Sequence, residues 1–191
     1  MKRRIPQLSF LLTMAMLVLV IKFDPGVSAE VSKSSNPGAG PTAQETINPR
    51  SYYRLTTQWT GTSKSLDIVN DGKKNNQLIL ANTDNVSGQM WKFTPLAGGY
   101  YRLTTEWQPG KSLDVVNDGK NNKLALAKTA MVSGQYWKIS PLGEGYYRLT
   151  TQWQGDGKSL DIVNDGKNNN QLILASTDNV TGQMWKITKV K

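Results

Sequence analysis

A threefold internal repeat is the feature that most limits how this chain can fold. The motif Tyr-Tyr-Arg-Leu-Thr-Thr-x-Trp begins at Tyr52, Tyr100 and Tyr146, so successive copies start 48 and 46 residues apart. Each copy continues through Lys-Ser-Leu-Asp and closes on Gln-x-Trp, which gives repeats at 52–99, 100–145 and 146–191. A repeat of this length is one supersecondary unit that cannot bury its apolar face alone. The three units must therefore close on one another around a shared core.

Apolar and polar side chains alternate within each copy. Leu66 and Ile68 flank Asp67, and Trp91 and Phe93 flank Lys92. Alternation over short runs separated by Asn-Asp-Gly and Ser-Gly clusters is typical of half-buried strands joined by turns. In the first copy the pattern predicts strands at about 52–58, 64–69, 77–82 and 89–94. Three copies give twelve strands, so we expect an all-β protein.

Two closed arrangements suit three units of four strands. A propeller needs about four to eight blades around its channel, so three blades would require a second chain to complete them. That arrangement remains an alternative. A barrel capped by hairpins removes exposed sheet edges within one chain, and we favour it for that reason.

The first 50 residues differ in composition from the repeats. Three charged residues precede an apolar run at 8–21, and the small residues Val27, Ser28 and Ala29 follow. This pattern predicts a signal peptide at 1–29, because the run is shorter than the roughly 20 residues of a spanning helix. Residues 30–50 are rich in Ser, Asn, Pro, Gly, Ala and Thr, which predicts a flexible linker. We therefore expect a secreted domain at 51–191, extracellular or periplasmic, without a membrane span after cleavage.

The residues that are missing narrow the possible functions. The chain has no Cys and no His, so it lacks the residues for disulfides, for a Cys-His or Ser-His-Asp site and for a histidine metal site. Removal of 1–29 takes away Lys2, Arg3, Arg4, Lys22 and Asp24 and lowers the net charge from +9 to +6. The remaining lysines are spread over the repeats, unlike the clustered basic stripe of a nucleic-acid groove. We expect no enzyme activity, cofactor or nucleic-acid partner, while attraction to an acidic polysaccharide remains open.

The three closing motifs resemble a known repeat. Gln89-Met90-Trp91, Gln135-Tyr136-Trp137 and Gln183-Met184-Trp185 are similar to the Gln-x-Trp repeat of ricin B-type lectins. The resemblance covers all three copies and implies a β-trefoil with pseudo-threefold symmetry and carbohydrate binding. Because linked weak sites favour a ligand that presents repeated sugars, we expect a polysaccharide or a glycosylated cell surface as partner of a non-catalytic lectin. The resemblance also implies that Trp91, Trp137 and Trp185 are structural core residues.

The resemblance implies a sugar site in each repeat. Its carboxylate matches Asp67, Asp114 and Asp161, its glutamine matches Gln89, Gln135 and Gln183, and a following asparagine stands at Asn70, Asn117 and Asn164. An ionised carboxylate accepts strong hydrogen bonds from hydroxyl groups. The alternative for the aspartates is to brace the neighbouring turn, and for the asparagines to form that turn. The glutamines of the family lie near the sugar and also tie strands together, and we expect their role here to be mainly structural.

The sequence departs from the family at the aromatic platform for the sugar. Ala81, Ala127 and Ala175 stand at that position, and Gly88, Gly134 and Gly182 replace the asparagine that usually precedes Gln-x-Trp. Trp59, Trp107 and Trp153 could supply a replacement platform, because an aromatic face suits the apolar side of a sugar ring. The other interpretation is that they plug the barrel end.

Unequal copies predict unequal sites. The outer repeats carry Asp84-Asn85 and Asp178-Asn179 where the middle repeat has Ala130-Met131, so we expect stronger outer sites. A glycosidase using Asp67 and Asp71, an accessory module of a glycoside hydrolase, and a trefoil that docks or inhibits a protein through its loops are the competing functions. Asp67, Asn70 and Asp71 are spaced wrongly for a calcium loop, so no metal is expected.

Overall fold

The computed structural model describes residues 47–191, which form twelve strands and four short 3-10 turns. The predicted signal peptide at 1–29 and the linker as far as residue 46 lie outside the described residues. The strands are β1 Tyr53–Thr57, β2 Lys64–Ile68, β3 Leu78–Asn82, β4 Trp91–Pro95, β5 Tyr101–Thr105, β6 Lys111–Val115, β7 Leu124–Lys128, β8 Trp137–Gly143, β9 Tyr146–Thr151, β10 Gly155–Ile162, β11 Leu172–Ser176 and β12 Trp185–Lys189. Four strands fall in each repeat, as the alternation predicts.

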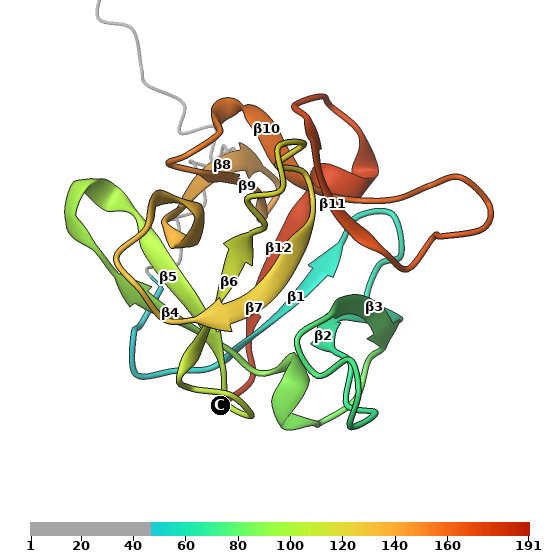
Figure 1. The fold of residues 1–191 in the computed structure, drawn as a ribbon. Helices are drawn as coiled ribbons and strands as arrows, with labels where there is room; N and C mark the ends of the chain where they lie inside the picture. The colour runs from blue at the N-terminus through green and yellow to red at the C-terminus, as the bar shows by residue number, and fades with distance from the viewer. Residues whose placement is uncertain (1–46) are drawn as a thin grey trace, which may run out of the picture. The chain divides into compact units, whose positions relative to one another are not determined.

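Six strands form a closed antiparallel ring. β1 pairs with β4, β4 with β5, β5 with β8, β8 with β9, β9 with β12, and β12 returns to β1. The first and last strands therefore lie side by side (Figure 1). Closure leaves no free edge in this barrel, which removes the unpaired backbone groups that would otherwise invite aggregation.

The other six strands form three hairpins, β2 with β3, β6 with β7 and β10 with β11. The hairpins interlock through the backbone. The N–H groups of Leu80, Leu126 and Leu174 donate to the carbonyl oxygens of Asn170, Asn76 and Asn122, at 2.8, 2.9 and 2.8 Å. Each repeat thus bonds to the loop of the repeat before it, and the first repeat bonds to the third. A six-stranded barrel with this cyclic set of hairpins is a β-trefoil, so the expected fold is confirmed.

The core is built from matched sets of three residues. Leu55, Leu103 and Leu149 are fully buried, and so are Trp91, Trp137 and Trp185. A buried indole N–H needs a hydrogen-bond acceptor. Each tryptophan donates to the carbonyl oxygen of a buried leucine in its own repeat, at 2.9 Å in all three: Leu66, Leu113 and Leu160. The indoles therefore tie three of the six barrel strands, β4, β8 and β12, to the three hairpins.

The predicted linker at 30–50 ends earlier than the composition indicated. Ile47 packs against the core, and the Asn48 N–H donates to the Tyr53 hydroxyl at 2.7 Å. Tyr53 is buried against Phe93, with the two rings edge to face at 5.6 Å between centroids. Phe93 stands where the other repeats have Ile139 and Ile187, so this aromatic contact is particular to the first repeat. Residues 47–50 therefore belong to the folded domain.

A 3-10 turn precedes the fourth strand of each repeat, at Ser87–Gln89, Ser133–Gln135 and Thr181–Gln183. Strand β4 consequently begins at Trp91 and not at Gln89, where the alternation placed its start. The physical reason is that the Gln89 side chain bonds to Asp67 and to the backbone of Asn82 and Asp84, which holds this segment in the turn. Within residues 47–191, no helix is both long enough and apolar enough to cross a bilayer.

Replacing Trp185 with Phe tests the indole bond. We expect the free energy of unfolding to fall by about 1–3 kcal/mol, because the Leu160 carbonyl loses its partner in the core. Urea unfolding monitored by circular dichroism measures the change. The control Lys186→Ala alters the exposed neighbour and should change the stability by no more than about 0.5 kcal/mol. Equal stability of Trp185→Phe and the parent would show that this bond is dispensable.

Candidate functional site

The three predicted carboxylates occupy the same place in each repeat. Asp67, Asp114 and Asp161 lie on β2, β6 and β10, and each is partly exposed between two buried residues. Asp67 Oδ1 accepts from the Ile68 N–H at 2.7 Å, and Oδ2 accepts from Gln89 Nε2 at 3.0 Å. An ionised carboxylate can accept about four hydrogen bonds. The aspartate therefore keeps acceptor capacity for an outside donor.

The glutamines lie behind the carboxylates. Gln89 is only 1% exposed, and its amide bonds to Asp67, to the Asn82 carbonyl at 2.8 Å and to the Asp84 N–H at 2.9 Å. Gln135 and Gln183 make the same three kinds of bond to Asp114 and Asp161 and to the chain after β7 and β11. Their amides are engaged by the protein itself, so these residues hold the aspartates in position.

The three glycines that replace the family's asparagine make room for the carboxylates. Gly88, Gly134 and Gly182 are buried, and a Cβ built on Gly134 or Gly182 would stand 2.5 Å from Oδ1 of Asp114 or Asp161. The Cβ of any larger residue at Gly88 would collide with Asp67 in the same way. The glycine thus allows the carboxylate to lie flat against the 3-10 turn. This departure from the family pattern is a structural requirement of these sites.

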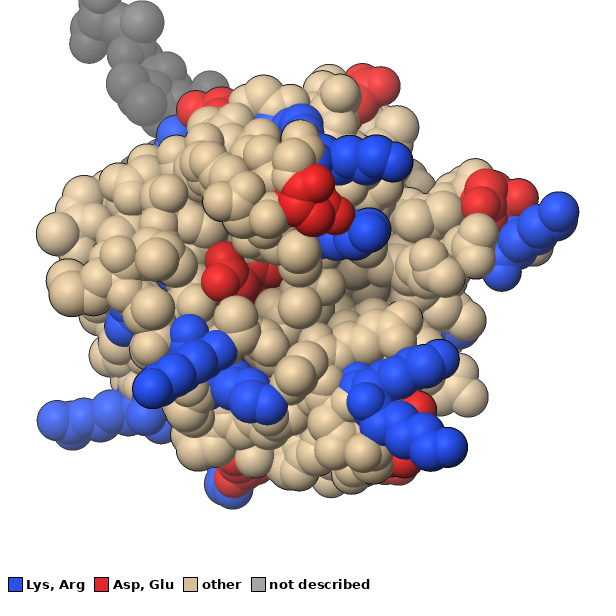
Figure 2. Space-filling view, viewed as in Figure 1, with Lys and Arg blue, Asp and Glu red and all other residues tan. Residues whose placement is uncertain are grey.

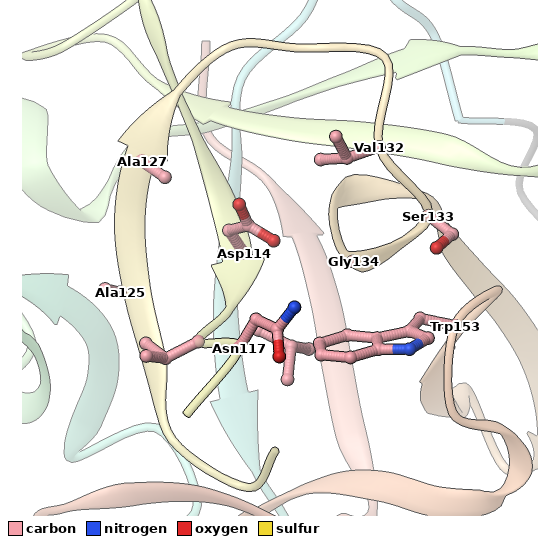
Figure 3. Close-up of a pocket in the computed structure, with 10 residues that line it drawn as sticks. Asp114, Asn117, Ala125, Ala127, Val132, Ser133, Gly134 and Trp153 are labelled. Atoms are coloured by element: carbon pink, nitrogen blue, oxygen red, sulfur yellow. The ribbon is translucent and has the colours of Figure 1, made fainter. Parts of the chain in front are cut away.

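A cavity opens beside each aspartate. The middle cavity, of about 510 Å³, is lined by Asp114, Asn117, Ala125, Ala127, Val132 and Trp153, and Figure 3 shows Asp114 and Asn117 projecting into it. The first cavity has about 380 Å³ and contains Asp67 and Asn70, while the third has about 340 Å³ and contains Asp161 and Asn164. The structure therefore brings each predicted aspartate and asparagine together in one hollow.

The tryptophan of each cavity comes from the next repeat. Trp107 lines the cavity of Asp67, Trp153 that of Asp114, and Trp59 that of Asp161. The backbone N–H of Trp107 donates to the Ser87 carbonyl at 3.3 Å, which holds the second repeat's loop against the 3-10 turn of the first. Each indole also packs on the core cluster. Each tryptophan therefore lines the cavity of the preceding repeat and also contacts the core, and the first repeat's Trp59 serves the third in this arrangement.

The Asn-Asp-Gly turns are braced by a different aspartate. Asp71 Oδ1 accepts from the N–H groups of Lys73 and Lys74 at 2.8 and 2.6 Å, and Asp118 and Asp165 do the same in their loops. These backbone N–H groups lower the pKa of Asp71 below its ordinary value of 3.8. Asp67 is therefore free of the bracing role that the sequence left open for it.

The lowered pKa of Asp71 also bears on the glycosidase alternative. A general acid in such enzymes needs a carboxyl group whose pKa is raised so that it holds a proton. Asp71 is exposed, lies outside the residues that line the cavity, and has its pKa shifted the opposite way. Asp71 therefore does not have the properties of the general acid in such a pair.

The residues that motivated stronger outer sites face elsewhere. Arg54 Nη2 donates to the Asp84 carbonyl and to Asn85 Oδ1, both at 2.9 Å, and Arg148 contacts Asp178 and Asn179 in the same way. None of these four residues lines the cavities; the following valines Val86 and Val180 do. The differences between Asp84-Asn85, Asp178-Asn179 and Ala130-Met131 therefore give no reason to expect weaker ligand binding at the middle site.

Sequence reasoning missed one set of cavity residues. Ile79, Ala125 and Ile173 line the three cavities from the third strand of each repeat. The alternation along the third strand could have identified these residues. Leu78 and Leu80 are buried on either side of Ile79, which places the Ile79 side chain on the face away from the core. Among residues 47–191 no group of three or more acidic side chains gathers to hold a metal ion.

The fold and its three carboxylate cavities define a β-trefoil with repeated surface sites. A family model described as the ricin-type β-trefoil lectin domain matches residues 51–187. The chain belongs to the ricin-type β-trefoil lectin family, as the Gln-x-Trp motifs indicated. No curated protein sequence gives a significant match.

Solved structures share the fold. A designed threefold-symmetric protein, ThreeFoil, is 26% identical with a TM-score of 0.63 over 73% of this chain and 99% of that one. An exo-β-1,3-galactanase from Clostridium thermocellum is 24% identical with a TM-score of 0.63, over 75% of this chain and 31% of that one. SeviL bound to asialo-GM1 saccharide is 17% identical with a TM-score of 0.55, over 74% of this chain and 98% of that one. The last two similarities concern the fold alone.

Adding a methyl group at Gly134 tests the fit between glycine and carboxylate. We expect Gly134→Ala to displace Asp114 and to lower the free energy of unfolding by about 1–3 kcal/mol, as overpacking does. Thermal unfolding measures the loss, and a crystal structure of the variant locates the carboxylate. Gly110→Ala is the matched control, because a Cβ there meets no atom within 4 Å. An undisturbed Asp114 in the variant would contradict the steric explanation.

Proposed function

We propose that this protein is a secreted, non-catalytic lectin that binds saccharides in its three cavities. The observation that carries the proposal is the recurrence, in every repeat, of a half-exposed aspartate, an asparagine amide and an indole around one hollow. The carboxylate accepts hydrogen bonds from sugar hydroxyls, the amide donates or accepts, and the indole covers an apolar ring face. Membership of the ricin-type family supports the same ligand class.

Repetition suits a ligand that presents many copies of one sugar. Sites linked on one rigid body can raise the overall affinity about a hundredfold over that of one site. A polysaccharide or a glycosylated cell surface therefore fits better than a free monosaccharide. Lys and Arg lie in separate groups on the face seen in Figure 2 and form no continuous basic stripe there, which favours this partner over nucleic acid. Secretion is proposed from the N-terminal sequence alone.

Replacing the three aspartates tests the proposal. On a glycan array the parent protein should bind at least one class of saccharide, and the triple variant Asp67→Asn, Asp114→Asn, Asp161→Asn should lose that binding. Each replacement removes charge-assisted bonds of about 1.5–3 kcal/mol, which corresponds to roughly ten- to hundredfold at each site. Circular dichroism confirms that the variant is folded.

Asp84→Asn combined with Asp178→Asn is the matched control. Both residues are exposed aspartates outside the cavities, so this variant should bind like the parent. Loss of binding in the control would restore the case for outer sites that depend on those residues. Binding that survives in the triple variant would instead favour docking through the loops, and a folded parent that binds no glycan would refute the lectin proposal.

A second variant set tests the sharing of sites between repeats. In a protein that keeps only Asp67, made by Asp114→Asn and Asp161→Asn, Trp107→Ala should weaken saccharide binding about tenfold because it removes the ring platform. Trp59→Ala in the same background is the control and should leave binding unchanged, since Trp59 lines the cavity of Asp161. Titration with the saccharide identified on the array measures both. The reverse result would place the platform within its own repeat.

A further inference from the structure

The middle cavity differs from the other two at the residue beside its carboxylate. In each hairpin one residue of the third strand pairs directly with the aspartate: Ile79 with Asp67, Ala125 with Asp114 and Ile173 with Asp161. Directly paired side chains in an antiparallel ladder lie on the same face, with Cβ atoms about 4.5–5.5 Å apart. The middle aspartate therefore has a methyl group as its neighbour, where the outer aspartates have a branched four-carbon chain.

The cavity beside the alanine is larger than the two cavities beside the isoleucines. The middle cavity has about 510 Å³, compared with about 380 and 340 Å³ for the first and third. Figure 3 shows Ala125 and Trp153 on opposite sides of the cavity, with Asn117 between them. An isoleucine in place of Ala125 would project into this space from the β7 side. The extra room thus lies beside the carboxylate, within reach of a group attached to the ring that Asp114 binds.

The segment that precedes the 3-10 turn also differs in the middle repeat. Met131 is 89% exposed and Val132 is 45% exposed, and Val132 lines the cavity. The outer repeats carry Asn85 and Asn179 in place of Met131, and both of these amides are bound by an arginine. In the middle repeat Arg102 donates to the Ala130 carbonyl at 3.0 Å, which leaves the thioether open to solvent. Val86 and Val180 line the outer cavities with similar exposures of 40% and 42%, so the difference in this segment is confined to Met131, which is not a lining residue.

The middle carboxylate has fewer bonds within the protein. Asp67 and Asp161 each accept from the following backbone N–H at 2.7 Å and from a glutamine at 3.0 Å. In the described part of the chain, Asp114 accepts a side-chain hydrogen bond only from Gln135, at 3.0 Å. More of its acceptor capacity is available to a ligand in the roomier cavity.

We propose that the middle site selects saccharides that carry a bulky, partly apolar substituent, such as an acetamido group, which the isoleucines of the outer sites exclude. Ala125 is the residue that sets this specificity. The hydroxyl groups of the ring bond to Asp114, and the methyl end of the substituent occupies the space beside Ala125 and Trp153. The inference rests on the proposed lectin function and divides the three cavities into two small sites and one large site.

Single-site proteins provide the test. Asp67→Asn with Asp161→Asn leaves the middle site, and Asp114→Asn with Asp161→Asn leaves the first site. The probes are methyl β-D-galactopyranoside and methyl β-D-glucopyranoside, each compared with its 2-acetamido-2-deoxy counterpart. Ligand-observed NMR titration follows binding that is too weak for other methods. The middle-site protein should prefer the acetamido member of at least one pair about tenfold, and the first-site protein should not.

Exchanging the wall residues supplies reciprocal controls. Ala125→Ile should abolish the preference of the middle-site protein, and Ile79→Ala should create it in the first-site protein. Both residues face away from the core, and an unchanged unfolding midpoint verifies that the folds are intact.

The outcomes separate the two proposals. Three results would overturn the size-selective middle site. The two single-site proteins could show the same preference, or the preference could fail to follow the exchanged residue. The middle-site protein could also bind neither member of each pair. Saccharide binding on the array would still leave the lectin assignment intact in these cases. A folded parent that binds no glycan overturns both.

Discussion

Closure of three incomplete units around one core is the constraint on which the rest of this structure depends. Each repeat contributes buried leucines and one buried tryptophan, but none of these sets encloses itself. The bond from Leu80 to Asn170 and the pairing of β1 with β12 join the first repeat to the last. Because burial of the apolar face is the main favourable term in folding, the chain gains most of it only when the ring of repeats is complete.

The same closure creates the sites. Every cavity lies at a junction, where the aspartate of one repeat meets the indole of the next. The link is the backbone, since the N–H of Trp107 extends the barrel ladder onto the 3-10 turn that carries Gly88 and Gln89. A single repeat thus holds a carboxylate without the indole that lines its cavity. Folding and the proposed ligand binding share one set of contacts, and the third cavity exists only because the chain returns to its start.

The network around each carboxylate explains how the sites depart from the family pattern. A buried glutamine fixes one oxygen, and a glycine leaves space for the other. The third strand carries Ala81, Ala127 and Ala175 where the family has its aromatic residue, and the indole of each cavity comes from the neighbouring loop. Ala125 and Met131 then distinguish the middle repeat within an otherwise repeated design.

The sequence by itself determined the number of repeats, the four strands of each, the buried tryptophans and the aspartates as ligand candidates. The repeats and their strands follow from local alternation and from the repeat spacing, both of which can be read along the chain. The buried tryptophans and the candidate aspartates follow from the resemblance of the Gln-x-Trp motifs to the ricin-type family. The tertiary structure alone decided that residues 47–50 join the core, that the glutamines are buried behind the carboxylates and that Asp84 and Asn85 bind Arg54. It also decided that each indole serves the preceding repeat. The physical reason is that these contacts join residues whose separation along the chain carries no signal of their proximity, and only the closed ring of strands brings them together.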